Sequence, residues 1–463
     1  MPANQILTAA LTRATEAALI ARGVSVDVLM QQAGRGAAEW VWRMAAGRSV
    51  TVLCGPGNNG GDGYVIAEAL RGRGGTVQVV MAAEPASAAA KVARGLYQGA
   101  VLPDDAVPQG EVLVDCLFGT GLTRPLSAGD LALLNRLAAG HRQLIAVDLP
   151  SGVDANLGQA LNPDLPANDL TLALGAWKFA HFLLPAAARM GALQLVLIGL
   201  AAVEGAAEVI ARPRFTAPAA EAHKYTRGLL AVVGGAMPGA ALLAASAAQH
   251  AGTGYVKLLS HAAGAPPDLV CDARPLDEAL SDTRLNAVLL GPGLGRDAAA
   301  RAAVAQVLAR QAPTVLDADA LLALTPTLLK ERTSPLIVTP HGGELIALEQ
   351  AFGLSGAGSK PDRARALARA GSMVVVAKGA DTVVAGPGCA LALAQRASSW
   401  LSTAGTGDVL AGVIASRLAC GSDAFTAACD GVWLHGEAAR LCPPPFTAGE
   451  LAAQVRSAYA ACL

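Results

Sequence analysis

The 463-residue sequence is long enough for about two or three domains of ordinary size. Hydrophobic residues make up 53% of it and charged residues 15%, a composition that excludes intrinsic disorder and predicts a large buried interior. The formal net charge of −1 gives no basis for binding to nucleic acid or to an anionic membrane.

The N-terminal residues lack the basic segment and the apolar segment of a signal peptide, so we expect none. The apolar run 193–203 is shorter than the roughly 20 residues that a membrane span needs. The eight cysteines include no C-x-x-C pair, which disfavours a disulfide framework or a zinc site. These features predict a cytoplasmic protein with reduced thiols.

Apolar runs alternate with helical patterns through the first half of the chain. The runs at 49–54, 76–81, 111–116, 143–148 and 170–174 are rich in leucine and β-branched residues, as strands buried on both faces are. The alternation predicts an α/β domain with a doubly wound, mostly parallel sheet, whose ligands bind at the carboxyl ends of the strands.

Three loops rich in glycine and small polar residues follow three of these strands: GPGNNGGDG (55–63), FGTGLTRP (118–125) and LPSGVD (149–154). Parallel strands place such loops at one edge of the sheet, where ligands bind. The first loop matches neither G-x-x-x-x-G-K-[ST] nor G-x-G-x-x-G. Because glycine and proline are costly inside helices, we expect 54–63 to be irregular and a helix to begin at Gly63, with Asp62 either capping it or facing a ligand.

A proline-containing segment at 212–224 interrupts the alternation, and a second series of apolar runs begins at 229–235. We therefore predict a first domain at 1–213, a linker at 214–222 and a second α/β domain at 223–463.

The segment STAGTGDVLAGVIA (402–415) places a glycine-rich turn directly before an apolar helix. The free backbone N–H groups and the dipole of such a helix start attract anions such as phosphate. Asp408 in the first turn could take the proton from an attacking hydroxyl in phosphoryl transfer, or it could simply cap the helix.

Two further strand ends leave alternatives open. Lys378 and Gly379 end one apolar run and Asp381 and Thr382 begin the next, which fits either a plain hairpin or a nucleotide-binding turn. His341 follows another run and either faces a ligand or is a satisfied structural residue.

The second half carries an ordered set of motifs over roughly 223–460. They read HKYTRG (223–228), GAALLAASAAQHAGTGYV (239–256), GPGLG (291–295), LDADAL (316–321), TPHGGE (339–344), KGADT (378–382) and AGTGD (404–408). Together they resemble the ADP- or ATP-dependent dehydratases of hydrated NAD(P)H, within the ribokinase-like superfamily.

The first half carries a second set over about 5–212. It comprises ILTAALTRATEAALIARG (6–23), LMQQAG (29–34), GPGNNGGDG, DCLFGTG (115–121) and DLPSGVD (148–154). This set resembles the epimerase domain for the same hydrates. The fused pair resembles the bifunctional NAD(P)H-hydrate repair enzymes, which implies a Rossmann-like first domain and a ribokinase-like α/β/α second domain.

The resemblance implies a division of chemistry. Hydration of the nicotinamide C5=C6 bond leaves a C6 hydroxyl and destroys the hydride donor. The second domain would phosphorylate that hydroxyl in the S epimer, using Mg²⁺ with ADP or ATP and Asp408 as the base, and then eliminate phosphate. The first domain would interconvert the 6R and 6S epimers, with Asp148 as the leading acid/base candidate and Lys178 as the second.

The resemblance also implies the binding residues. The nucleotide would be bound by Lys378, Gly379, Ala380, Asp381, Thr382, Gly405, Thr406 and Gly407. The hydrate would be bound in the second domain by Ala240, Gly293, His341 and Asp408. It would be bound in the first domain by Asn58, Asn59, Gly60, Gly61, Asp62, Gly119, Thr120, Gly121, Leu122, Thr123, Arg124, Pro125 and Asp148. A potassium ion would be bound by Asn59, Asp115 and Ser151.

Two other functions share parts of this pattern. A ribokinase-like kinase of a vitamin precursor, with an accessory first domain, would release a stable phosphorylated product. A non-enzymatic binding module fused to a degenerate kinase is disfavoured by the intact acids of both glycine-rich loops. We expect the hydrates NADHX and NADPHX and preferably ADP as small-molecule partners, no nucleic-acid or membrane partner, and a homo-oligomer.

Overall fold

The computed structural model describes residues 2–260 and 264–463. They form two compact units, which meet in sequence between Ala206 and Ala207. The segment 214–222 lies within the second unit and contains no helix or strand, and its role as a linker stays a prediction. None of the described helices is long and apolar enough to cross a membrane, and all eight cysteines are free.

The first unit is built on a seven-stranded parallel sheet of order β4-β3-β2-β5-β6-β7-β9. Its strands are β2 (Val50–Cys54), β3 (Val77–Met81), β4 (Ala100–Leu102), β5 (Gly110–Cys116), β6 (His141–Val147), β7 (Leu170–Leu174) and β9 (Ala192–Val196). A short parallel pair joins β1 (Gln5–Leu7) to β8 (Trp177–Lys178).

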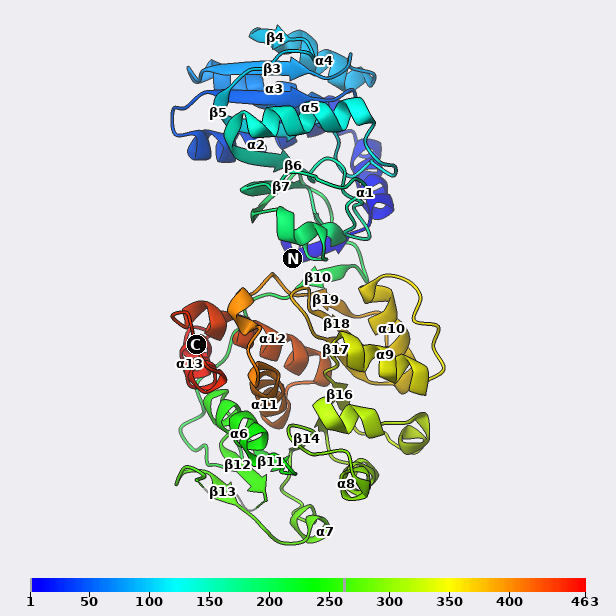
Figure 1. The fold of residues 1–463 in the computed structure, drawn as a ribbon, viewed down its shortest axis with the longest axis vertical. Coiled ribbons are helices and arrows are strands. Elements are labelled where there is room, and N and C mark those ends of the chain that lie inside the picture. The colour runs from blue at the N-terminus through cyan, green and yellow to red at the C-terminus, as the bar shows by residue number, and fades with distance from the viewer. Residues whose placement is uncertain (1, 261–263) are drawn as a thin grey trace. The chain divides into compact units, whose positions relative to one another are not determined.

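Helices cover both faces of this sheet (Figure 1). They are α1 (Ala9–Ala21), α2 (Val26–Ala45), α3 (Asn58–Gly72), α4 (Ala88–Leu96) and α5 (Ala128–Ala139), with 3₁₀ turns at Pro2–Asn4, Phe179–His181 and Ala186–Arg189. Val52 packs into the core beneath α2, α3 and α4, whereas the next residue, Leu53, packs toward α5. The continuous apolar strands therefore contribute side chains to two cores, one on each face of the sheet. The predicted doubly wound architecture is confirmed.

The glycine-rich stretch is helical from Asn58 onward, which corrects the expectation of a helix that begins only at Gly63. A Cβ on Gly60 would lie 1.8 Å from the carbonyl oxygen of Gly55, and one on Gly63 would lie 2.7 Å from Cys54 Sγ. The glycines thus allow α3 to pack closely on a strand end, and that packing outweighs their low helix propensity. Asp62 is a buried residue of the second helical turn and caps nothing.

The second unit has the strand order β13-β12-β11-β14-β15-β16-β17-β18-β19-β10. Pairing is parallel from β13 to β17 and antiparallel on both sides of β18, and β10 is parallel to β19. The strands are β10 (Ala207–Val209), β11 (Leu229–Val233), β12 (Tyr255–Leu259), β13 (Val270–Cys271), β14 (Ala287–Leu290), β15 (Thr314–Leu316), β16 (Leu336–Val338), β17 (Val374–Ala377), β18 (Val383–Ala385) and β19 (Leu391–Leu393).

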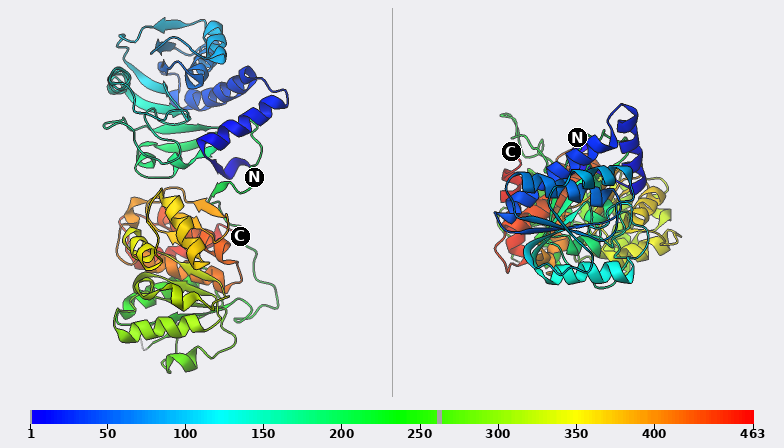
Figure 2. Two further views of the ribbon diagram at one scale, coloured as in Figure 1. Left: turned by 90° about the vertical axis from the view of Figure 1, so that its right-hand side faces the viewer. Right: turned by 90° about the horizontal axis from the view of Figure 1, so that it is seen from above.

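Two layers of helices enclose this sheet, which gives the expected α/β/α arrangement (Figures 1 and 2). One layer is α6 (Pro238–His250), α11 (Thr406–Ala419) and α12 (Ala424–Leu441), with α13 (Ala448–Ala460) packed against it. The other is α8 (Ala298–Ala309), α9 (Gly342–Ala351) and α10 (Lys360–Gly371). The short helix α7 (Leu276–Ala279) and 3₁₀ turns at Ala318–Ala323, Pro326–Leu329 and Ser399–Leu401 complete the unit.

Gly60→Ala should lower the free energy of unfolding of the full chain by about 1–3 kcal/mol, because the new methyl overlaps the Gly55 carbonyl oxygen. In Gly72→Ala, at the last residue of the same helix, the new Cβ meets no atom within 4 Å from other described parts of the chain, so the free energy of unfolding should change by less than about 1 kcal/mol. Urea denaturation of both variants measures the difference, and equal stabilities would contradict the packing explanation.

Candidate functional sites

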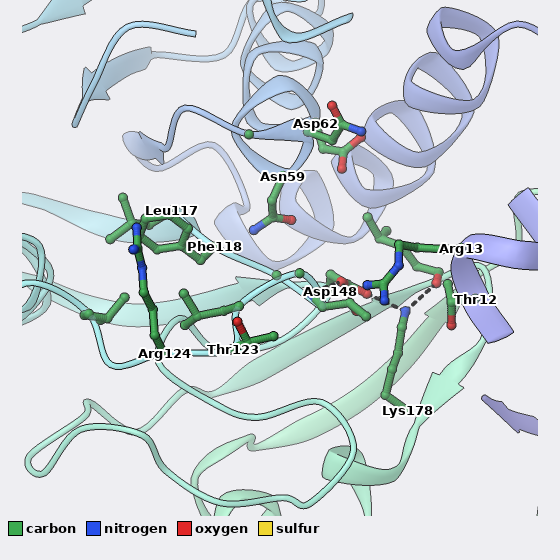
Figure 3. A pocket seen from close by; sticks show the side chains of 18 of the residues that line it. Thr12, Arg13, Asn59, Asp62, Leu117, Phe118, Thr123, Arg124, Asp148 and Lys178 are labelled. Carbon is green, nitrogen blue, oxygen red and sulfur yellow. Dashed lines mark hydrogen bonds and ion pairs between the residues drawn. The ribbon is translucent and has the colours of Figure 1, made fainter. Parts of the chain in front are cut away.

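A cavity of about 650 Å³ lies where β2, β5 and β6 end in the first unit (Figure 3). Its walls include Asn58, Asn59, Asp62, Asp148 and the whole of 119–125, all of which the sequence predicts as hydrate-binding. The remaining two predicted residues, Gly60 and Gly61, do not line the cavity but pack α3 against its neighbours.

A buried ion pair forms one wall of this cavity. Lys178 is 1% exposed, and its Nζ donates to Asp148 Oδ1 at 2.5 Å and to the carbonyl oxygen of Leu174 at 2.7 Å. Thr120 donates its backbone N–H to Asp148 Oδ2 at 2.8 Å, and its hydroxyl donates to the same oxygen. Burial would raise the pKa of Asp148, but the Lys178 ammonium and the Thr120 hydrogen bonds outweigh burial and lower it. Asp148 is therefore held as a carboxylate.

His181 fixes this pair from behind, a role that the sequence did not suggest. Its Nδ1 accepts the backbone N–H of Lys178 at 2.9 Å, so the ring proton lies on Nε2, which donates to the Asp148 carbonyl at 2.8 Å. Burial lowers the pKa of His181 to about 4, so the ring is neutral near pH 7. Asp148 has φ 67°, a left-handed conformation that few non-glycine residues adopt, and its backbone N–H donates to the Leu172 carbonyl at 2.7 Å.

The residues predicted as potassium ligands lie around the same strand ends. Asp115 accepts the Ser151 hydroxyl at 2.7 Å and the Ser151 backbone N–H at 2.9 Å, and both residues are buried. Burial raises the pKa of Asp115 against these hydrogen bonds. Both polar atoms of the Asn59 amide are buried without a hydrogen-bond partner among the described residues. A Cβ on Gly119 would lie 3.3 Å from Asn59 Cγ and 2.8 Å from Asp148 Oδ2, so only glycine leaves this space open.

Asp62, Glu16 and Asp130 also line the cavity. Asp62 is 8% exposed, and burial first and then the Asp148 charge raise its pKa well above the usual value. Glu16 on α1 is half-buried, and burial likewise raises its pKa. The sequence did not single out Glu16, although Thr12, Arg13 and Glu16 share one face of α1 at helical spacing and all line the cavity.

In the second unit, the Lys378 side chain lies between Asp317, which follows β15, and the start of α11. Its Nζ donates to Asp317 Oδ1 at 2.6 Å, and a Cβ on Gly407 would lie 3.5 Å from that Nζ. Asp408 lies in the first turn of α11, half-buried and without a hydrogen bond from any described residue. Burial and the Asp317 charge raise the pKa of Asp408 to about 6, although Lys378 opposes them. The structure therefore brings together the predicted base, a predicted nucleotide residue and the anion-attracting helix start.

The turn 378–382 joins β17 to β18, as the sequence predicts. Thr382 closes it by donating its hydroxyl to the Gly379 carbonyl at 2.7 Å. Lys360 at the start of α10 donates to the Lys378 carbonyl at 3.1 Å and to Asp381 Oδ1 at 2.6 Å. Lys360 was missed because a single lysine before a polar helix carries no sequence signal.

His341 has a structural role. Its Nδ1 accepts the backbone N–H groups of Gly343 and Glu344, which caps α9, while the Glu344 side chain accepts the His341 N–H. Its side chain is 61% exposed, so the cap leaves the rest of the ring accessible. Glu344 Oε2 lies 4.0 Å from Lys378 Nζ, which connects the cap to the Lys378 group.

Of the other predicted residues in this unit, Ala240 and Gly293 adjoin, since a Cβ on Gly293 would lie 3.1 Å from that of Ala240. Thr406 is buried, and its hydroxyl donates to the carbonyls of Leu401 and Thr403. Ala380 lies in the turn that Lys360 braces. Gly405 precedes α11 at φ 91°, a conformation that favours glycine.

Comparison with known proteins gives matches to both units. Residues 26–180 match the family model described as "YjeF-related protein N-terminus", and residues 230–459 match "NAD(P)H-hydrate dehydratase". Proteins called "Bifunctional NAD(P)H-hydrate repair enzyme Nnr" are similar along nearly the whole chain. The one from Moorella thermoacetica is 34% identical over 89% of this chain and 87% of its own, and the one from Mycobacterium leprae is 32% identical over 98% of each. A solved Bacillus subtilis ADP/ATP-dependent NAD(P)H-hydrate dehydratase is 29% identical over 54% of this chain and 95% of its own, with a TM-score of 0.47.

Lys178→Met should lower the free energy of unfolding by about 3–5 kcal/mol, because it leaves the buried Asp148 carboxylate without its cation. The double variant Lys178→Met/Asp148→Asn should recover part of that loss, since neither charge then remains. Urea denaturation measures both, and a loss below about 1 kcal/mol in the single variant would show that the pair is not needed for stability.

Proposed function

The chain belongs to the family of bifunctional NAD(P)H-hydrate repair enzymes, and we propose that its two units catalyse successive steps of one repair. The first unit interconverts the 6R and 6S hydrates, and the second converts the S hydrate back to NADH or NADPH. The observation that carries the proposal is the placement of Asp408, a carboxyl without a hydrogen-bonding partner in the described part of the chain, beside Lys378 and the start of α11.

In the second unit, Asp408 takes the proton of the C6 hydroxyl as the hydroxyl oxygen bonds to the terminal phosphorus of the nucleotide. The bond from that phosphorus to the bridging oxygen breaks, and the nucleotide leaves with one phosphate fewer. The backbone N–H groups of Gly405, Thr406 and Gly407 and the Lys378 ammonium stabilise the charge on the transferred phosphoryl group. Phosphate is a far better leaving group than hydroxide. The lone pair of the ring nitrogen then expels it, and loss of a C5 proton restores the C5=C6 bond.

The nucleotide is bound by the turn 378–382. Lys360 donates hydrogen bonds to this turn, and the Nζ of its first residue, Lys378, lies beside Gly407 of α11. Mg²⁺, when bound with the nucleotide, neutralises charge on the phosphates. We propose ADP as the preferred donor. Ala240, Gly293 and the exposed part of His341 contribute to the wall for the hydrate.

In the first unit, the cavity at the ends of β2, β5 and β6 binds the hydrate, with Asp148 acting on C6 and residues 119–125 and Asn58 contacting the rest of the molecule. The donor set of Asn59, Asp115 and Ser151 fits a potassium ion, because the Asn59 amide oxygen lacks a partner and Asp115 supplies a single buried carboxylate. Such an ion supplies a fixed positive charge that attracts the pyrophosphate of the hydrate.

The vitamin-kinase alternative is not favoured, because the bifunctional relatives align with 89% and 98% of this chain, which includes both units. A cytoplasmic location and a homo-oligomeric state remain predictions from the sequence.

Asp408→Asn should abolish recovery of dihydronicotinamide from the S hydrate by at least about 100-fold, because no base remains for the C6 hydroxyl. It should leave epimerisation within about twofold of the unaltered enzyme. Asp148→Asn should do the reverse, so the two variants are controls for each other. Chromatographic separation of the epimers and absorbance of the recovered cofactor give the two rates. Loss of both activities in either variant would refute the division of roles.

Dehydration should also depend on pH through Asp408. Since a base must be unprotonated and the pKa of Asp408 is raised to about 6, kcat/KM should be level above neutral pH. It should fall roughly tenfold per unit of pH well below 6, whereas an ordinary exposed aspartate would hold the rate down to about pH 4. A profile level down to pH 5 would contradict the role of Asp408 as base.

A further inference from the structure

Asp62 is the one carboxyl of the epimerase cavity that is both deeply buried and unpaired within the described residues. It is 8% exposed, on the second turn of α3, and receives no hydrogen bond or ion pair from any residue that the structure describes. Asp148, by contrast, has both oxygens occupied by Lys178 and Thr120. A buried, unpaired carboxyl is costly, and its retention at a cavity wall points to chemistry rather than to folding.

The two carboxyls occupy facing walls. Figure 3 shows Asn59 and Asp62 extending from α3 on one side of the cavity, with Asp148 and Lys178 on the other side. Asn59 and Asp62 are three residues apart and so share a face of the helix. A flat ring between these walls would present one face to Asp62 and the other to Asp148.

The protonation states of the two groups differ in the direction that acid–base work requires. Burial and the nearby charges of Asp148 and Glu16 favour the neutral acid at Asp62, against the opposing effect of Lys178, and its pKa is raised. The pKa of Asp148 is lowered instead. Two carboxyls whose environments separate their pKa values are suited to serve as acid and base.

We propose that Asp62 is a catalytic residue of the epimerase, the general acid that protonates the C6 hydroxyl from one ring face while Asp148 directs water to the other face. This proposal rests on the epimerase function proposed for the first unit, and it specifies the chemical steps of that reaction.

Epimerisation proceeds by loss and return of water at C6. Asp62 gives its proton to the C6 hydroxyl, the C6–O bond breaks with its electron pair on oxygen, and water leaves. The ring nitrogen lone pair forms the N1=C6 bond of a cationic iminium. A water on the opposite face then bonds to C6, the N1=C6 electron pair returns to nitrogen, and the Asp148 carboxylate takes the proton. Exchange with solvent returns a proton to Asp62 and removes one from Asp148.

Charge in the cavity favours this course. When Asp62 loses its proton it becomes a carboxylate beside the iminium cation, and Glu16 and Asp148 add negative charge at the same site. Glu16 is a weaker candidate for the acid, because it is half-buried on the long, flexible side chain of an outer helix, whereas Asp62 is fixed on the closely packed start of α3.

The test uses the full-length chain without nucleotide, so that only epimerisation proceeds. Purified 6R hydrate is the substrate, and the 6S product is separated by chromatography. Asp62→Asn should lower kcat by about 100-fold or more with KM nearly unchanged, and Asp62→Glu should regain part of that rate. The exposed Asp27→Asn on α2 is the control and should keep the full rate. Dehydration of the 6S hydrate by the second unit, with nucleotide then added, confirms that each variant chain is folded.

A second measurement needs no variant. In H₂¹⁸O, each conversion by the unaltered enzyme should place one ¹⁸O at C6 of the product, because the leaving and entering waters use opposite faces. Retention of the original oxygen, or a wild-type kcat in Asp62→Asn, would overturn the proposal, as would a loss carried by Glu16→Gln instead. If the unaltered chain does not interconvert the epimers at all, the proposed epimerase function fails rather than this assignment.

Discussion

In-register pairing of parallel strands is the constraint on which both sites depend. In the first unit Cys54 lies opposite Cys116, so the loops after β2 and β5 emerge together, and β6 adds Asp148 beside them. In the second unit Leu316 pairs with both Leu290 and Val338, which places Asp317 beside the neighbouring strand-end loops. Because every strand of such a series ends at one edge, residues far apart in sequence are brought together there.

Both edges then use charge in the same way. Each pairs a lysine with a buried aspartate, Lys178 with Asp148 and Lys378 with Asp317, and each leaves a second carboxyl nearby that has a raised pKa and no partner among the described residues. The ion pair fixes the lysine and its neighbours, and the unpaired carboxyl is available for proton transfer. The unpaired carboxyls of the two sites suit different roles. Asp408, with its pKa of about 6, is mostly ionised near pH 7 and suits a base. Asp62 is more deeply buried and suits an acid.

Most of this arrangement is predictable from the sequence, because long apolar runs followed by glycine-rich loops determine strands, layers and the ligand-binding edge. Lys378 and Asp408 were singled out from their places at a strand end and a helix start, whereas Asp148 and Lys178 were proposed from the resemblance of their motifs to a known family. The helical start of α3 was not predicted. Its glycines are explained by close contacts with Gly55 and Cys54, and no local sequence pattern indicates those contacts. Glu16, His181 and Lys360 were missed for a similar reason, since each acts through residues that only the fold brings near.

The most direct test of the two-step repair is to supply the purified chain with a mixture of both C6 epimers of hydrated NADH, Mg²⁺ and ADP or ATP, and to follow the absorbance of dihydronicotinamide. The proposed function predicts recovery of all the damaged cofactor, because epimerisation continually feeds the S form to the second unit. Recovery that stops when the S epimer is exhausted would contradict the epimerase half, and no recovery with either nucleotide would contradict the proposed function as a whole.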